Sequence, residues 1–189
     1  MKRLFYSIFL LIILCPAKLQ AQEGQPLDML IASTADALVD WLFSLPRYND
    51  VESGRLYDTA VYFLKDYRFS NSIVKYMTHK PNMVYTQKNG SAWIYSYQEY
   101  SEQKWHLTKK VRLPKEMTLN ILDGPFIKFY HDTISIHIRS SYLGWGKYRN
   151  GKWHGKGWTI GVSDWVTCKY IYSKTEERWV MVESDFGGI

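Results

Sequence analysis

The sequence predicts an α+β fold, in which N-terminal helices pack on one face of a curved, mainly antiparallel sheet. Between residues 27 and 45, apolar residues recur every three or four positions, as they do on one face of an amphipathic helix. After Pro81 the pattern changes to short segments of alternating apolar and polar residues, which are typical of half-buried strands. Helices followed by a run of strands indicate helices gathered on one side of an antiparallel sheet.

The predicted helices lie in the first half of the chain. The first one covers residues 27–45 and ends before Pro46, because proline cannot continue a helix. Between residues 51 and 78 we expect two shorter helices. One covers residues 54–67, and the other starts after Asn71, a favourable N-cap residue.

The strand signals begin with Asn89-Gly90, a dipeptide that favours the tight turn of a β-hairpin. Residues 83–86 and 92–97 flank this turn, so they are predicted to pair. A short helix is expected over residues 96–104. The remaining predicted strands cover residues 110–113, 126–130, 133–139, 158–172 and 178–184.

The N-terminus has the parts of a secretory signal peptide. A positive start at residues 1–3 precedes an apolar run over residues 4–14, and Ala21 offers a small residue for cleavage. The apolar run is shorter than the roughly 20 residues that a membrane-spanning helix needs. We therefore expect residues 1–21 to be removed and residues 22–189 to form a single α+β domain, exported to the periplasm or the extracellular space.

Two alternatives stay open at this end of the chain. Residues 12–15 resemble a lipoprotein signal in which Cys15 carries the lipid, although a small residue normally precedes that cysteine and Leu14 stands there. In the second alternative the apolar run stays attached as an N-terminal anchor. Cleavage after Ala21 agrees better with the sequence than either alternative.

The charge balance changes once the signal peptide is set aside. The full chain has 24 Lys+Arg and 18 Asp+Glu, but Lys2, Arg3 and Lys18 belong to the signal peptide, so the exported domain keeps 21 cations and a net charge of +3. Its basic character therefore gives no argument for nucleic-acid binding. Only Cys15 and Cys168 are present, so we expect no disulfide within the domain.

The order of these elements resembles a known superfamily. The likeness lies in three segments, "MTHKPNMVYTQKNGSAWIYSYQEYSEQKW", "DTISIHIRSS" and "GVSDWVTCKYIYSKTEERWVMVESDFGG". The chain resembles the nuclear transport factor two-like superfamily, especially its SnoaL-like bacterial members. The resemblance implies a cone-like fold, with a curved sheet around helices and a cavity at the open end. Isomerases, dehydratases, transport adaptors and binding proteins share that fold, so it does not select a function.

Asp164 is the acidic residue with the most unusual predicted position. In a strand it shares one face with Val162, Val166, Cys168 and Tyr170, which are apolar or aromatic. A carboxylate on such a face costs free energy unless it has a partner, and a general base or ligand anchor in a cavity has this environment. The alternative is a structural carboxylate at the start of the strand or at a bulge.

Aromatic residues suggest two further sites, because the chain has 8 Trp, 15 Tyr and 8 Phe. Trp93, Tyr95 and Tyr97 fall on one strand face, and together with Asp164 and Tyr170 they are the candidate ligand-binding residues. The glycine-rich segment 144–158 is the second. Its candidate interaction residues are Trp145, Tyr148, Trp153 and Trp158. Core packing explains the first set equally well, and a twisted hairpin whose rings pack on their own sheet is the alternative for the second.

Other polar residues give weaker signals. His137 and Arg139 lie opposite the isoleucines of the predicted strand 133–139, where they form either an anion-binding or interface patch or a solvated strand face. The five histidines show no short ligand spacing, and there is no phosphate loop or nucleophile motif. We therefore expect no metal and no cofactor, and we expect Cys168 to be an inert core thiol.

The sequence favours an exported accessory domain that binds a small ligand or a partner protein without catalysis. One alternative is an acid–base lyase or isomerase that uses Asp164. Another is a protein- or glycan-interaction module that uses the aromatic segment 145–158. The sequence contains no second apolar stretch long enough to span a membrane.

Overall fold

The computed structural model describes residues 25–45, 57–64, 71–98, 104–112, 118–150 and 152–188. The predicted signal peptide and the lipidation site at Cys15 lie outside the described residues. The helices are α2 (Leu27–Ser44) and the single turn α4 (Asn71–Val74). The strands are β1 (Tyr57–Leu64), β2 (Asn82–Thr86), β3 (Ser91–Tyr97), β4 (Trp105–Arg112), β5 (Thr118–Tyr130), β6 (Thr133–Arg149), β7 (Lys152–Ser173) and β8 (Arg178–Gly187).

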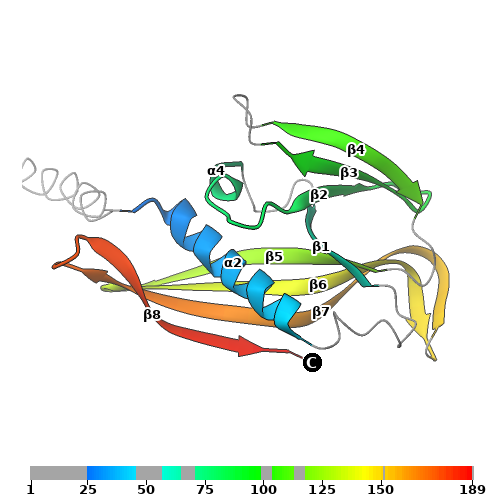
Figure 1. The fold of residues 1–189 in the computed structure, drawn as a ribbon. Helices are drawn as coiled ribbons and strands as arrows, with labels where there is room; N and C mark the ends of the chain where they lie inside the picture. Colours follow the sequence, from blue (N-terminus) through cyan, green and yellow to red (C-terminus); the bar gives the residue numbers. More distant parts are fainter. Residues whose placement is uncertain are drawn as a thin grey trace, which may run out of the picture.

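All eight strands of the described residues belong to one sheet, in the order β4-β3-β2-β1-β5-β6-β7-β8. Strand β1 is parallel to both of its neighbours, β2 and β5, and every other pairing is antiparallel. Figure 1 shows α2 lying across β5, β6 and β7, and α4 packs against α2. Among the described residues, no helix is both long and apolar enough to cross a lipid bilayer.

The predicted fold class, helices packed on a mainly antiparallel sheet as in a cone-like cavity fold, is wrong. The described chain is mostly a mixed sheet, with α2 as its one long helix. The main error is the helix predicted over residues 54–67, where the structure has β1. This segment is rich in β-branched and aromatic residues, which favour strands. Val61, Tyr62 and Phe63 are all buried, so β1 is covered on both faces and its unbroken apolar run imitates a helical pattern.

Other local predictions have mixed outcomes. Asn89-Gly90 does connect a hairpin, because β2 and β3 pair in antiparallel register on either side of it. The helix after Asn71 forms but ends at Val74. Over residues 96–104, β3 continues to Tyr97 instead of becoming helical, and residues 99–103 lie outside the described residues. The predicted strands of the second half are present but longer, as β4 to β8.

A first hydrophobic core lies between α2 and the sheet. The apolar stripe of α2, which includes Leu38 and Leu42, packs against residues of β6 and β7 such as Ile136, Ile138 and Val166. Each of these side chains is almost fully buried, and such burial stabilises the fold by about 1.5–3 kcal/mol per side chain. The alternation predicted for residues 133–139 is confirmed by the buried isoleucines.

A second core occupies the opposite face of the sheet. Its residues come from β1, β2, β3, β5 and β6, and they are Tyr62, Val84, Ala92, Ile94, Leu119, Ile121 and Leu143. Trp158 packs against this core and its indole N–H donates a 2.8 Å hydrogen bond to the carbonyl of Gln87. Trp145 contacts the Trp158 ring edge-on at 5.5 Å between ring centroids. The two tryptophans therefore fasten the long β6–β7 hairpin to the β2–β3 turn.

A substitution of Gly90, which lies in that turn, tests the contact with Trp145. Its φ is +87°, and a Cβ added there would lie 2.9 Å from the Trp145 ring. We expect Gly90→Ala to lower the free energy of unfolding by about 1–3 kcal/mol, because it combines left-handed backbone strain with a clash. Denaturant melts measure the change. Gly157→Ala is the matched control, because its φ is also positive, at +154°, and nothing lies within 4 Å of an added Cβ there. Equal effects of the two substitutions would contradict the packing role of this turn.

Candidate functional site

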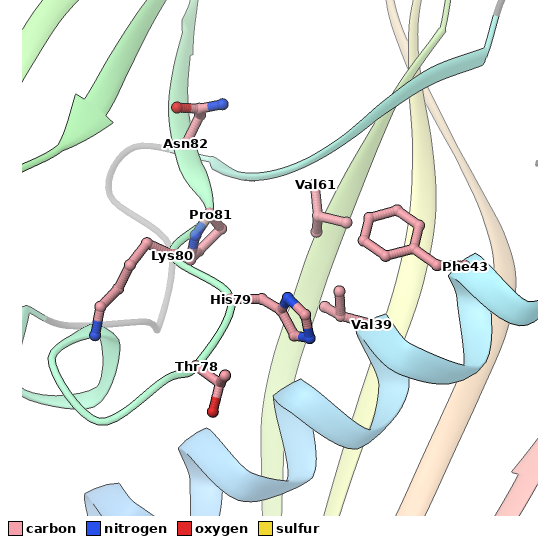
Figure 2. A pocket seen from close by; sticks show the side chains of 8 residues that line it. All are labelled: Val39, Phe43, Val61, Thr78, His79, Lys80, Pro81 and Asn82. Carbon is pink, nitrogen blue, oxygen red and sulfur yellow. The ribbon is translucent and has the colours of Figure 1, made fainter.

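A cavity of about 350 Å³ opens between α2, β1 and the segment that connects α4 to β2. Figure 2 shows its lining residues, which are Val39, Phe43, Val61, Thr78, His79, Lys80, Pro81 and Asn82. Val39, Val61 and Pro81 are buried and form an apolar floor. The size lies at the small end of the range for ligand pockets, which is roughly 300–1,000 Å³.

Asp36 of α2 fixes the wall of the cavity formed by residues 78–82. Its Oδ2 accepts a 2.7 Å hydrogen bond from the backbone N–H of Thr78, and its Oδ1 accepts a 3.1 Å bond from that of His79. One carboxylate thus holds two consecutive amides. Charge-assisted hydrogen bonds of this kind are stronger than neutral ones, so the segment is pinned to the helix.

Lys80 holds the other end of this segment. Its ammonium donates to the carbonyls of Val74 at 3.2 Å and Lys75 at 2.8 Å, at the end of α4. A cation at this position is favoured by the partial negative charge of a helix C-terminus, although α4 is only a single turn. In Figure 2 the Lys80 amine points away from the apolar floor, so Lys80 shapes the wall rather than the interior.

His79 is the polar side chain that faces the floor. Its Nε2 lies 2.7 Å from Oδ1 of Asp40, and its ring meets Phe43 edge-on at 6.4 Å between centroids. The two side chains are 42% and 68% exposed, so the pair contributes little to stability. Its effect is orientation: an ionised carboxylate only accepts, so Nε2 donates to Asp40 and Nδ1 remains as the other hydrogen-bonding atom of the ring. Figure 2 shows the ring beside Val39.

The arrangement suits a compact ligand with an apolar body and one hydrogen-bonding group. The floor would contact the apolar part and the His79 ring would contact the polar group. Among the described residues there is no cluster of three or more His, Cys, Asp or Glu that could hold a metal ion.

Asp164 lies elsewhere in the structure. It is fully buried on β7, on the face that points to α2, together with Val166, Cys168 and Tyr170. Gly188 packs directly on its carboxylate, because a Cβ added to Gly188 would lie 2.1 Å from Oδ1 and 3.4 Å from the Trp41 ring. Of the described residues that line the cavity, none comes from β7. The carboxylate is therefore enclosed by packing and does not face the cavity.

The other candidate ligand-binding residues are also dispersed. Trp93 and Tyr95 are half-buried on β3, whereas Tyr97 is buried and meets Trp105 edge-on at 5.1 Å. The Tyr170 hydroxyl lies 2.8 Å from Thr34 Oγ1 and 3.2 Å from the carbonyl oxygen of Leu30, so it ties the sheet to α2. Burial raises the pKa of Tyr170 to about 12. The structure does not bring Asp164 and the β3 aromatics into one cavity.

The aromatic segment of β6 and β7 is partly accounted for by packing. Trp145 and Trp158 contact the β2–β3 turn, as described above. Tyr148 and Trp153 are register partners in the β6–β7 hairpin, but their side chains lie outside the described part of the structure. Burial also raises the pKa of the Cys168 thiol, as expected for a cysteine in the core.

His137 and Arg139 lie on the sheet face opposite α2. The Arg139 guanidinium pairs with Asp123 and lies 4.6 Å from the centroid of the Phe126 ring. His137 lies between Phe126 and Trp165, and its Nδ1 is 2.9 Å from Thr167 Oγ1. These contacts form a packed layer on the outer face of the sheet.

Sequence reasoning missed the cavity residues. His79 pairs with Asp40 across 39 residues of sequence, and no local spacing reveals such a contact. A weak signal did exist, because Asp36, Asp40 and Phe43 follow four- and three-residue steps and so share one side of α2.

The chain matches no family model, no curated protein and no solved structure. The resemblance to the nuclear transport factor two-like superfamily stays a prediction.

Asp36 offers a test of how the cavity wall is held. We expect Asp36→Ala to lower the free energy of unfolding by about 1–2 kcal/mol, because two charge-assisted hydrogen bonds are lost. Amide hydrogen exchange should accelerate at Thr78 and His79. Asp185→Ala, an exposed change on β8, is the control and should alter stability by less than about 0.5 kcal/mol. Unchanged exchange at both amides would contradict the anchoring role.

His137 gives a pH-dependent prediction. Burial, and then the nearby Arg139 cation, lower the pKa of His137 from 6.5. Protonation of His137 is therefore less favourable in the folded chain than in the unfolded chain. His137 contributes its full share of the free energy of unfolding above pH 6.5, and this contribution is lost as the pH falls below 6.5.

We expect His137→Gln to reduce the fall in melting temperature between about pH 7.5 and about pH 5. The matched control is His106→Gln, on the exposed side of β4, which should leave that fall as it is in the unsubstituted chain. A fall of the same size in all three proteins would show that His137 does not contribute.

Proposed function

We propose that the protein is an exported, non-catalytic accessory domain that binds a small ligand in the cavity between α2 and residues 78–82. The observation that carries this proposal is the His79 ring, held by Asp40 at 2.7 Å beside an apolar floor. A buried floor with one oriented polar group is the usual composition of a small-molecule pocket. The export signal predicted at residues 1–21 supports a role outside the cytoplasm.

Fragment binding followed by NMR tests this proposal. The probes are monocyclic aromatic and short aliphatic compounds that carry one hydroxyl, carbonyl or carboxyl group. We expect binders to shift the backbone amides of residues 39–43 and 78–82. His79→Gln should weaken those binders about tenfold, which corresponds to roughly 1.4 kcal/mol. The control His106→Gln should leave affinity unchanged. A panel without any effect on these amides would contradict the proposal.

Acid–base catalysis in the same cavity is a second candidate. The His79–Asp40 pair favours it, because a carboxylate that orients an imidazole is a common arrangement for a general base. Asp164 does not support this function, since its carboxylate is enclosed by Gly188. Binders from the fragment panel can be followed in heavy water for loss of C–H signals. Exchange that requires His79 would favour the enzyme over the binding domain.

The aromatic interaction module has less support. Two of its four rings, Trp145 and Trp158, already contact each other and the β2–β3 turn. Rings engaged in this way have less surface to offer a glycan or a protein partner.

A further inference from the structure

Four hydrogen-bond donors in the cavity wall are already engaged. The backbone N–H groups of Thr78 and His79 both donate to Asp36. The ammonium of Lys80 donates to two carbonyls at the end of α4, and Nε2 of His79 donates to Asp40. An anionic ligand would have to break one of these bonds to obtain such a donor, which costs free energy. These donors therefore disfavour an anion in the cavity.

The His79 ring offers the cavity an acceptor instead. Because Nε2 donates to the Asp40 carboxylate at 2.7 Å, the neutral ring carries its lone pair on Nδ1. In Figure 2 the Thr78 hydroxyl and the Asn82 amide point away from the apolar floor, whereas the His79 ring lies beside it. A ligand on the floor pairs with His79 only if its polar group is a hydrogen-bond donor.

Negative charge gathers on the helix side of the cavity. Asp36 and Asp40 lie one turn apart on α2, and both contact the wall, Asp36 through two amides and Asp40 through the His79 ring. The cation of Lys80 is turned toward the carbonyls at the end of α4, and Figure 2 shows it pointing away from the floor. These three charges together favour a cation over an anion at the floor.

We propose that the cavity binds a small organic cation, in the form of a protonated amine on a monocyclic or short aliphatic body. The ammonium group donates to Nδ1 of His79 and is attracted by the charge of Asp40, while the apolar body lies on the floor. A hydroxyl group can make the same hydrogen bond without this attraction, and a carboxylate can do neither. This inference rests on the proposed function, because it names the ligand class of the same cavity.

Three compounds of nearly equal shape test the selection: cyclohexylmethylamine, cyclohexylmethanol and cyclohexanecarboxylate. Each is titrated into the full chain at about pH 8, at which alkyl amines are protonated and carboxyl groups are ionised. Dissociation constants are taken from the shifts of the backbone amides of residues 39–43 and 78–82. We expect the amine to bind about fivefold more tightly than the alcohol, and the alcohol about fivefold more tightly than the carboxylate, because each step changes the ligand by one unit of charge.

Salt gives a second measure of the same attraction. Raising the ionic strength from about 0.01 M to about 0.15 M should weaken binding of the amine and leave binding of the alcohol unchanged, because salt screens a partly exposed carboxylate.

The substitution Asp40→Asn separates the charge of Asp40 from its shape. The new amide is nearly isosteric with the carboxylate, and its oxygen can still accept from Nε2 of His79. We expect affinity for the amine to fall about fivefold, while affinity for the alcohol changes by less than about twofold. The matched control is Asp185→Asn, an exposed change on β8 that should alter neither affinity, because Asp185 pairs with Thr167 on the sheet face opposite α2. Thermal melts confirm that each variant is folded.

Two results would overturn the inference and leave the proposed binding cavity standing. One is an alcohol or a carboxylate that shifts these amides with an affinity equal to that of the amine or higher. The other is an equal loss of affinity for amine and alcohol in Asp40→Asn, which would mean that Asp40 only orients the His79 ring. If none of the three compounds shifts the amides of residues 39–43 and 78–82, the result contradicts both this inference and the proposed function.

Discussion

Packing of α2 on one face of the sheet determines where the rest of the molecule can lie. Eight residues of the helix are buried, and they contact strands β6 and β7 through Ile136, Ile138 and Val166. The hydroxyls of Thr34 and Tyr170 add a polar link in the middle of this apolar contact. With its apolar stripe fixed in this way, the helix presents Asp36 and Asp40 on its other side, where they hold residues 78–79 and the cavity wall.

The two cores explain why a small chain forms such a wide sheet. One face of β1 belongs to the core under α2, through Val61 and Phe63, and the other face belongs to the second core, through Tyr62. No helix of the described residues covers the second core. It is closed instead by other strands of the same sheet and by Trp158. The long β6–β7 hairpin therefore helps to cover the second core, which in many sheets is covered by a second layer of helices.

Local signals in the sequence predicted local structure well. The alternation of residues 133–139 and the Asn89-Gly90 turn both describe contacts between neighbours in the chain, and both are present. The helix predicted over residues 54–67 was wrong because burial on both faces removes the two-residue period of a strand. The cavity was missed for a different reason, since the His79–Asp40 contact joins distant segments. Asp164 was placed on the correct strand face, but the packing of Gly188 on it could not be inferred from periodicity.

The parallel pairing of β1 has a consequence for the order of folding. Strands β2–β4 and β5–β8 are two antiparallel meanders, each built from successive segments of chain. Strand β1 joins them, and its partners β2 and β5 are both parallel to it, so it can pair only after longer stretches of chain have closed into loops. Contacts of this kind form slowly. The topology therefore makes the pairing of β1 the step that joins the two meanders into one sheet, and both cores, which draw residues from the two meanders, depend on that step.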